Sequence, residues 1–174
     1  MFDLHFDLLP ESTRPLLELA REKSNWGEPL PAGWGRGMAF HNTWNVTPVV
    51  QVAEVSVANG EIRVQRVVCV LECGQVINPD GVAAQMEGGI VFGLTAALKN
   101  GITLENGAVQ ESNFHNYPLL QIHEMPEVEV YTIDSDDPPS GIGEMGVPPI
   151  APAVANAVFA ATGQRLRQMP FRLT

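Results

Sequence analysis

Residues 48–72, PVVQVAEVSVANGEIRVQRVVCVLE, carry the clearest structural pattern in the chain. This stretch contains two long runs rich in β-branched residues, and the dipeptide Asn59-Gly60 separates them. Asn-Gly favours the type I′ turn, which needs a positive φ at both central positions and joins antiparallel strands tightly. The sequence therefore predicts a β-hairpin that turns at residues 59 and 60. Residues 35–46, just before it, are also strand-like.

Helical patterns lie on both sides of this hairpin. Ser12 or Thr13 can cap a helix over residues 14–25, in which leucines form an apolar stripe. Residues 82–98 are long and apolar enough for a buried helix. Residues 151–163, APAVANAVFAATG, predict a helix of small residues that ends at a glycine C-cap.

Three glycines, Gly88, Gly89 and Gly93, fall within the predicted helix at residues 82–98. Each costs a helix about 1 kcal/mol relative to alanine. Such a cost indicates that the backbone must come close to something, either a neighbouring helix or a ligand.

The remaining segments complete the order of elements. Residues 102–111, ITLENGAVQE, predict a second hairpin around an Asn-Gly pair, and residues 126–133, PEVEVYTI, alternate like a strand. Residues 135–149, SDDPPSGIGEMGVPP, have the prolines and glycines of a loop. The order helix, hairpin, helix, hairpin, strand, helix predicts an α+β domain built on a mostly antiparallel sheet with packed helices.

Composition narrows the function classes. A chain of 174 residues with 45% hydrophobic content can bury a substantial core. Its formal net charge of -10 disfavours electrostatic binding to nucleic acid or to an anionic membrane. We expect no membrane-spanning segment, because no apolar run reaches about 20 residues, and no signal peptide, because MFDLHFDLLPEST lacks a basic region. The abrupt opening leads us to expect a fragment of a longer chain.

The cysteines and histidines predict no metal site. Cys69 and Cys73 have no second Cys or His pair at ligand spacing. On one strand they would face the same side roughly 13 Å apart, too far for a disulfide, so we expect buried free thiols. His115 and His123 lie eight residues apart without a metal-like cluster, and we interpret them as structural.

Two segments carry residues that suit chemistry. In residues 141–146, GIGEMG, Glu144 stands between Gly143 and Gly146, which leave its carboxylate approachable, although a Glu before a helix can simply complement the helix dipole. In residues 84–93, AQMEGGIVFG, Gln85 and Glu87 lie among apolar and small residues. An amide can donate to and accept from a heterocycle, although a helix-packing face would look the same. The sequence has no Walker loop, GxSxG or dinucleotide fingerprint.

Long ordered motifs in the chain resemble a known family. They are CGQVINPDGVAAQMEGGIVFGLTAAL (73–98), NFHNYPLL (113–120), MPEVEV (125–130) and GIGEMGVPPIAPAVANAVFAATGQRLRQMP (141–170). Together they resemble the C-terminal region of the molybdopterin-binding subunits of molybdenum hydroxylases, the xanthine dehydrogenase and aldehyde oxidase family, and most strongly the isoquinoline 1-oxidoreductase beta subunits. The resemblance implies that residues 13–174 are the C-terminal part of a molybdopterin-binding domain, while residues 1–12 stay unplaced.

The resemblance implies roles for three residues. Glu144 matches the Glu of the family's Gly-Glu motif, which lies beside the molybdenum centre and acts as general base. Gln85 matches the Gln of the Gln-x-Glu-Gly segment, which contacts the pterin cofactor, and Gly143 fixes the loop. Met145 departs from the pattern, because relatives often have proline or another small apolar residue there, and this leaves the rigidity of the loop open.

The implied activity is oxidative hydroxylation of an N-heteroaromatic, isoquinoline-like substrate or of an aldehyde, with water as the oxygen source. The implied cofactor is molybdopterin, including its cytosine dinucleotide form. The electrons must leave through iron-sulfur clusters, and the chain lacks their usual cysteine spacings, so a separate small iron-sulfur subunit is implied. The family's upstream glycine-rich segments are also missing, so we expect the chain alone neither to retain cofactor nor to turn over substrate.

Other functions stay open at this point. A noncatalytic domain that serves binding or assembly would carry the same glycines for packing. An unrelated hydrolase could pair Glu144 with Glu111 or Glu87, but no spacing in the sequence places two carboxylates together. The substrate is open between isoquinoline, other azaarenes, nicotinate-like rings and simple aldehydes, and the compartment is open between cytoplasm and periplasm.

Overall fold

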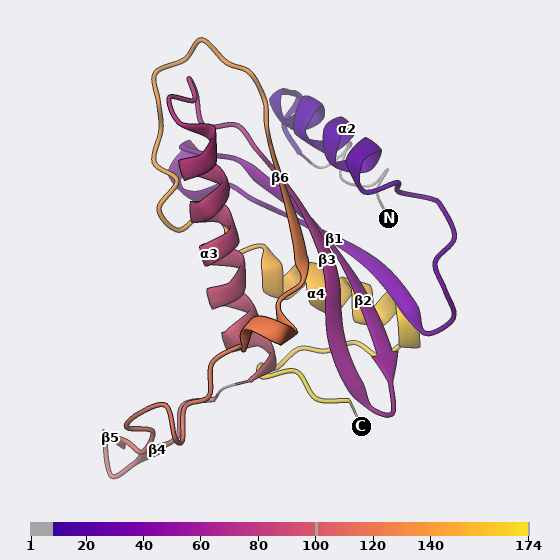
Figure 1. Ribbon diagram of the computed structural model, residues 1–174, viewed down its shortest axis with the longest axis vertical. Helices are drawn as coiled ribbons and strands as arrows, with labels where there is room; N and C mark the ends of the chain where they lie inside the picture. The colour runs from indigo at the N-terminus through magenta and orange to yellow at the C-terminus, as the bar shows by residue number, and fades with distance from the viewer. Residues whose placement is uncertain (1–8, 100, 174) are drawn as a thin grey trace.

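The computed structural model describes residues 9–99 and 101–173 and is built around a four-stranded sheet (Figure 1). The strand order is β1-β2-β3-β6; β2 pairs antiparallel with β1 and β3, and β6 runs parallel to β3. The strands are β1 Trp34–His41, β2 Val49–Ala58, β3 Glu61–Leu71 and β6 Glu127–Thr132. The predicted α+β class with a mostly antiparallel sheet is confirmed.

The central hairpin forms as predicted. Asn59 and Gly60 both have positive φ, 52° and 80°, as a type I′ turn requires. The pairing of β2 with β3 runs from Val49↔Leu71 to Ala58↔Glu61, with one irregularity beside Glu54. The strand-like stretch before the hairpin is shorter than predicted, because β1 ends at His41 and a 3-10 turn, η2 Thr43–Asn45, follows.

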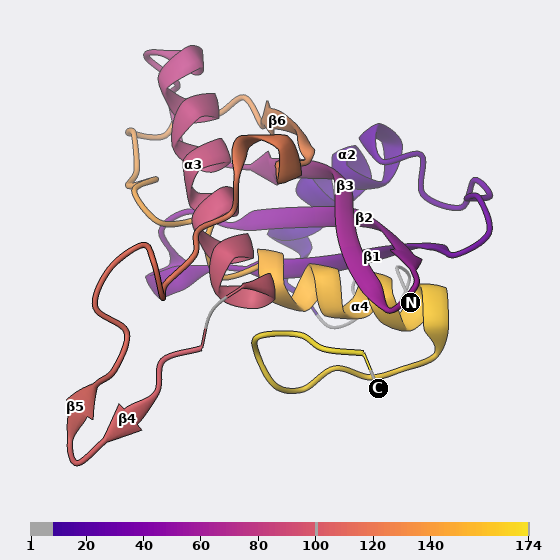
Figure 2. The same cartoon turned by 60° about the horizontal axis from the view of Figure 1, so that its bottom comes forward.

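Helices cover both faces of the sheet, and each face has its own core (Figures 1 and 2). Alternate residues of β2 point to opposite faces, which explains why the hairpin sequence is apolar almost throughout. The core under α2 (Arg14–Lys23) contains Leu16, Leu17, Ala20, Met38, Val50, Val52, Val68 and Val70. The core under α3 (Pro79–Leu98) and α4 (Ile150–Thr162) includes Val49, Ala53, Cys69, Ile90, Leu94, Val154 and Val158.

The helix ends follow local chemistry, with two corrections to the predictions. The side chain of Asn78 accepts from the backbone N–H of Gly81, so α3 begins before the predicted residue 82. Gly163 ends α4 in the left-handed conformation, as predicted. The predicted cap of α2 was wrong, because Thr13 donates its hydroxyl to the carbonyl of Pro10 and no side chain accepts at this helix end. A 3-10 turn, η1 Glu11–Thr13, leads into α2 instead.

An extended arm leaves the body of the molecule after α3. It contains the predicted second hairpin, with the short strands β4 Leu104–Glu105 and β5 Ala108–Val109 around Asn106 and Gly107. Residues 101–110 are all exposed, and the arm projects away from the sheet in both views (Figures 1 and 2). After the arm, a 3-10 turn, η3 Ile122–Glu124, leads to β6.

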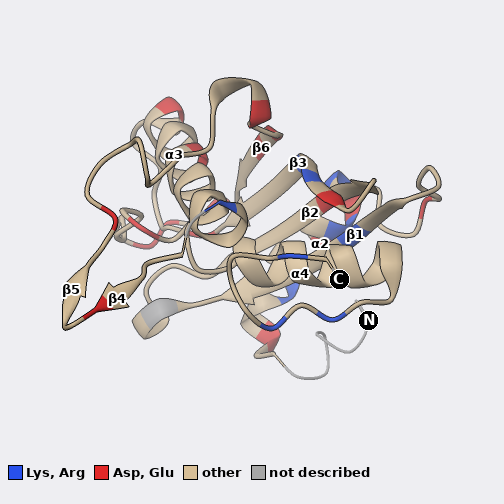
Figure 3. Cartoon of the chain, turned by 90° about the horizontal axis from the view of Figure 1, so that it is seen from below, with Lys and Arg blue, Asp and Glu red and all other residues tan. Residues whose placement is uncertain are grey.

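An ion-pair network ties the α2 side to the sheet. The carboxylate of Glu54 binds Arg36 at 2.7 Å and Arg66 at 3.4 Å, and Arg66 binds Glu129 at 2.5 Å. Figure 3 shows acidic and basic segments gathered on the strands in this region. Arg66 also donates to the carbonyl of Lys23 at the end of α2. The network therefore links all four strands of the sheet and a helix terminus.

The cysteines are free and buried, as predicted. They do not share a strand, because β3 ends at Leu71 and Cys73 lies beyond it. Burial raises the pKa of the Cys69 thiol to about 12 and also raises the pKa of Cys73. Of the histidines, His115 is exposed, and His123 accepts a hydrogen bond from Arg63 through its carbonyl.

Helix α3 is the one described helix that is long and apolar enough, by length and composition, to cross a membrane. Within its most apolar window the mean hydropathy is 1.3, and 44% of that window is buried inside the fold. A core helix passes the same test, so α3 is weak evidence for a span.

Candidate active site

The loop that carries Glu144 runs from Ser140 to Gly146, between β6 and α4 and against α3. Glu144 lies at a bend of this loop, and its side chain is exposed. Its backbone carbonyl accepts from the N–H of Val147 at 2.9 Å, which closes a tight turn. Within the described ranges, its carboxylate has no hydrogen bond or ion pair and so is available to accept a proton.

Helix α3 brings Gln85 to this loop. The Nε2 of Gln85 donates to the carbonyl oxygen of Gly143 at 2.5 Å, across 58 positions of sequence. Gly143 directly precedes Glu144. The structure thus brings together the three residues for which the sequence predicts a role in the site.

The glycines of α3 divide into two groups. A Cβ on Gly89 would lie 3.2 Å from the Cα of Gly146, and one on Gly93 would lie 2.5 Å from Cγ2 of Ile150, at the start of α4. These two glycines let the loop and α4 approach α3 closely, as the sequence predicts. A Cβ on Gly88 would meet nothing within 4 Å, so this glycine leaves an open face beside Gln85, one helical turn away.

Two further residues hold the loop, Thr47 just before β2 and Gln51 on β2, and sequence reasoning did not identify either of them. Buried Thr47 donates to the carbonyl of Gly141 at 2.8 Å and exchanges a 2.7 Å hydrogen bond with the hydroxyl of Ser140. Buried Gln51 donates to the carbonyl of Gly146 at 2.9 Å. The sequence offered one signal for Gln51, because it is the one amide side chain in the apolar run VVQVAEV (49–55).

The loop is therefore held at three glycine carbonyls, those of Gly141, Gly143 and Gly146. Met145, which departs from the family pattern, is buried and packs into the core. Because its side chain anchors the loop and the carbonyls are bound, Met145 is compatible with a fixed loop.

The residues present fit an organic cofactor with both donor and acceptor groups. The exposed Gln85 amide keeps its oxygen and its second N–H for a ligand, because only one N–H is used within the described part of the chain. The open backbone face at Gly88 and Gly143 would let a ring system come close. The described residues contain no group of three or more His, Cys, Asp or Glu that could hold a metal ion.

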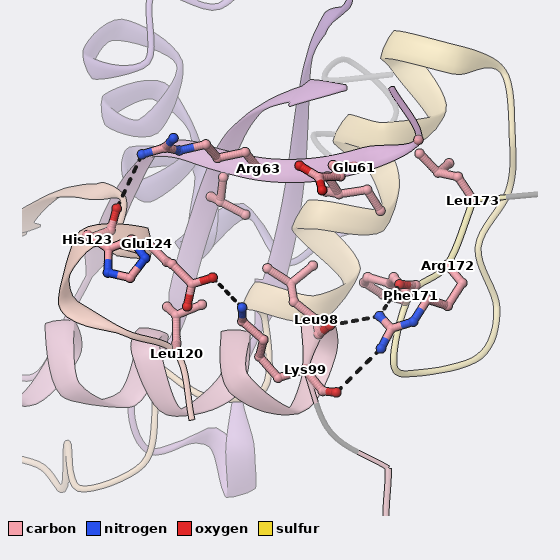
Figure 4. A pocket seen from close by; sticks show the side chains of 13 residues that line it. Glu61, Arg63, Leu98, Lys99, Leu120, His123, Glu124, Phe171, Arg172 and Leu173 are labelled. Carbon is pink, nitrogen blue, oxygen red and sulfur yellow. Dashed lines mark hydrogen bonds and ion pairs between the residues drawn. The ribbon is translucent and has the colours of Figure 1, made fainter. Parts of the chain in front are cut away.

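A cavity of about 490 Å³ lies elsewhere, between the β2–β3 turn, the end of α3 and residues 171–173 (Figure 4). Its cations are already engaged. Lys99 pairs with Glu124, while Arg172 donates to the carbonyls of Leu98 and Lys99. The Arg172 contacts fasten the C-terminal segment to the end of α3, and the ion pair joins Lys99 to η3, so the cavity is explained by packing.

The carboxylate pair Glu144 and Glu111 is not brought together. The carboxylate of Glu111 accepts from the backbone N–H of Thr103 at 2.8 Å within the arm. The arm leaves α3 at its C-terminal end, whereas the candidate loop contacts the N-terminal half of α3 (Figures 1 and 2). Glu87 is exposed on α3 and makes no described contact with Glu144.

Comparison with known proteins identifies the family to which this chain belongs. The chain belongs to the molybdopterin cofactor-binding domain family, whose model matches residues 20–126. The chain is 36% identical over 173 residues to isoquinoline 1-oxidoreductase subunit beta of Brevundimonas diminuta, covering 97% of this chain and 22% of that protein. It is also 36% identical to the membrane-bound aldehyde dehydrogenase [pyrroloquinoline-quinone] of Gluconacetobacter polyoxogenes, covering 87% of this chain and 20% of that protein.

A solved structure agrees with this assignment. The aldehyde oxidoreductase from Desulfovibrio desulfuricans ATCC 27774 matches with a TM-score of 0.60 and 28% identity, covering 71% of this chain and 14% of that chain. The chain thus spans about a fifth of the length of the two curated relatives named above.

Proposed function

We propose that this chain is the C-terminal part of the catalytic subunit of a molybdenum hydroxylase, which hydroxylates an N-heteroaromatic or aldehyde substrate with oxygen from water. The observation that carries the proposal is the hydrogen bond from Gln85 to Gly143, because it joins the expected cofactor contact to the loop of the expected base. Family membership supports the molybdenum cofactor, and the names of the two curated relatives support a heterocycle or an aldehyde as the substrate.

In this proposal Gln85 binds the pterin through its amide oxygen and its second N–H, which are not used in the hydrogen bond to Gly143. Gly143 has no side chain to keep the cofactor away from the backbone. When bound, the molybdenum cofactor supplies the two-electron redox centre of the reaction. The other side of the cofactor must be held by protein beyond the described residues, because the face that they form is open.

Glu144 is the general base of the proposal. Its carboxylate is free of described partners, and its loop is held on both sides, so it can take up a proton without first breaking an ion pair. A positioned base contributes typically about 10²- to 10⁴-fold in rate. Glu144 would take up the proton that the water-derived oxygen loses as it bonds to an electron-poor carbon of the substrate. The C–H bond of that carbon would break, and its hydrogen and two electrons would pass to the bound cofactor.

The finer features of the proposal concern partners and substrate. Electrons leave through iron-sulfur clusters of a separate small subunit, and the cofactor is the cytosine dinucleotide form of molybdopterin. The named relatives act on a heterocycle and on an aldehyde respectively, so both substrate classes belong in the test. The name of the second relative includes another cofactor, pyrroloquinoline quinone. Measuring the molybdenum content of the purified enzyme distinguishes a molybdenum enzyme from one that uses this quinone.

The first prediction is that Glu144→Gln abolishes turnover. The amide keeps the shape of the side chain but cannot accept a proton, so kcat should fall by at least about 10²-fold. The variant is made in the full-length subunit, purified as holoenzyme and assayed with isoquinoline and an aldehyde. Metal analysis should find the same molybdenum content as in the parent.

Glu105→Gln is the matched control, because Glu105 is an exposed glutamate on the arm, and it should leave kcat unchanged. Near-normal turnover by a molybdenum-loaded Glu144→Gln enzyme would refute Glu144 as the base. A parent protein that binds cofactor but oxidises neither substrate class would favour a binding or assembly role.

A further inference from the structure

Gln51 is a fully buried amide in the middle of the central sheet. It lies on β2, on the face covered by α3 and α4, and its exposed fraction is 0%. Its Nε2 donates to the carbonyl of Gly146 at 2.9 Å and lies 3.8 Å from the Sγ of Cys69. The bond to Gly146 spans 95 positions of sequence and ties the sheet to the loop of Glu144.

The stability of the core does not explain this amide. Its Oε1 has no hydrogen-bond partner within residues 9–99 and 101–173 and is shielded from solvent. A buried acceptor without a partner is unfavourable, and an apolar side chain of similar size at this position would avoid that cost. The bond that Gln51 does make must therefore be important for another reason.

That bond fixes the loop on the far side of Glu144. Gly146 lies between Gln51, which binds its carbonyl, and α3. A Cβ on Gly146 would lie only 2.8 Å from the carbonyl oxygen of Met86 on α3, so there is no room for a side chain. On the near side, Gln85 holds the carbonyl of Gly143. The two carbonyls that flank Glu144 and the buried Met145 are thus bound from the sheet and from α3.

We propose that Gln51 is a positioning residue, which sets the orientation of Glu144 through the carbonyl of Gly146. This inference rests on the proposed function, in which Glu144 is the base. Without the amide donor, the loop keeps its anchor at Gly143 but loses the one at Gly146, so the carboxylate can turn away from the reacting position.

The experiment uses the full-length subunit in its holoenzyme and the variant Gln51→Met, which keeps the side-chain length but removes the donor. We expect kcat to fall about 10- to 100-fold, as small displacements of a catalytic group do, while KM stays within about twofold. Molybdenum content and the thermal midpoint should stay near those of the parent. Gln65→Met is the matched control, because Gln65 donates to Ser56 on the same hairpin, away from the loop, and should leave kcat unchanged.

A second variant, Gln51→Glu, makes the effect depend on pH. A buried carboxyl group resists ionisation, and its neutral form can still donate to the carbonyl of Gly146, whereas the ionised form cannot. The ratio of variant to parent kcat should therefore be highest at low pH and fall as pH rises, within the range in which circular dichroism shows a folded protein. A purely structural role would lower the thermal midpoint without this pH-dependent loss of kcat.

The outcomes separate the two proposals. If Glu144→Gln is inactive while Gln51→Met keeps kcat within twofold, the positioning role is wrong and the base assignment stands. If Glu144→Gln is active, Glu144 is not the base, and the positioning role that rests on it is refuted as well. If Gln51→Met does not fold, the kcat ratio of Gln51→Glu decides, and a ratio that does not change with pH overturns the inference.

Discussion

At the scale of single residues, Glu129 gives the ion-pair network its pH dependence. The Nε of Arg66 donates to its carboxylate at 2.5 Å and the hydroxyl of Tyr131 donates at 2.6 Å, and these contacts lower the pKa of Glu129. A carboxyl group whose folded pKa lies below its unfolded value stabilises the fold when it is ionised. This stabilisation is complete above the unfolded pKa, about 4.3, and is lost as pH falls through the lower folded value.

Glu129→Gln should therefore reduce the free energy of unfolding at neutral pH by about 1 kcal/mol, since the side chain is partly exposed. The difference from the parent should shrink as pH falls below about 4.3. Urea unfolding at several pH values measures both effects. Glu105→Gln on the arm provides the control, and a Glu129→Gln deficit that stays constant down to the lowest pH would contradict this account.

The candidate site was partly predictable at this scale. Glu144 and Gln85 stand out in the sequence because polar side chains among glycines are visible without a structure. Gln51 and Thr47 do not, because the groups that they bind are backbone carbonyls more than 90 positions away. A backbone carbonyl leaves no mark on a sequence, so only the fold identifies its partner.

At the scale of elements, β1 and α4 pack so closely that only glycine fits between them. A Cβ on Gly37 would lie 2.1 Å from the backbone nitrogen of Ala157 and 2.4 Å from the carbonyl oxygen of Ala153. Both neighbours are backbone atoms of α4, which cannot move without displacing the helix. The small residues of α4, visible in the sequence, thus serve its contact with the sheet.

Gly37→Ala should destabilise the chain by about 3 kcal/mol or more, because overpacking against backbone cannot be relieved by a rotamer change. For a chain of this size that corresponds to a thermal midpoint lower by roughly 10 °C. Gly81→Ala, in the first turn of α3, would make only ordinary contacts with Asn78 and should leave the midpoint nearly unchanged or slightly raised. Differential scanning calorimetry of both variants tests the contrast, and equal midpoints would refute it.

At the scale of the whole molecule, the open face beside Gln85 and Glu144 limits what the chain can do alone. Gln85, Gly88, Gly143 and Glu144 are all exposed, so a cofactor placed there would meet protein on one side only. Bound small molecules usually have most of their surface buried in a pocket. The site thus needs protein from elsewhere to enclose its ligand.

We predict that the purified 174-residue chain retains far less than one molybdenum per chain and does not oxidise isoquinoline or an aldehyde. Metal analysis after gel filtration, together with substrate assays, measures this directly. A full-length subunit purified in the same way is the control and should carry stoichiometric metal. Stoichiometric molybdenum on the short chain would show that the described face suffices to hold the cofactor.

Most helices and strands, and the residues that suit chemistry, could be predicted from the amino-acid sequence. Turn dipeptides, caps and apolar periodicity act between near neighbours, which is why the hairpin at Asn59-Gly60 and helices α3 and α4 were predicted closely. Which of these elements contact each other became clear only from the fold. Strand β6 pairs in parallel with β3, and Gln85 and Gln51 hydrogen-bond to the Glu144 loop. These contacts join segments distant in sequence, because burial of apolar surface selects contacts that local patterns do not specify.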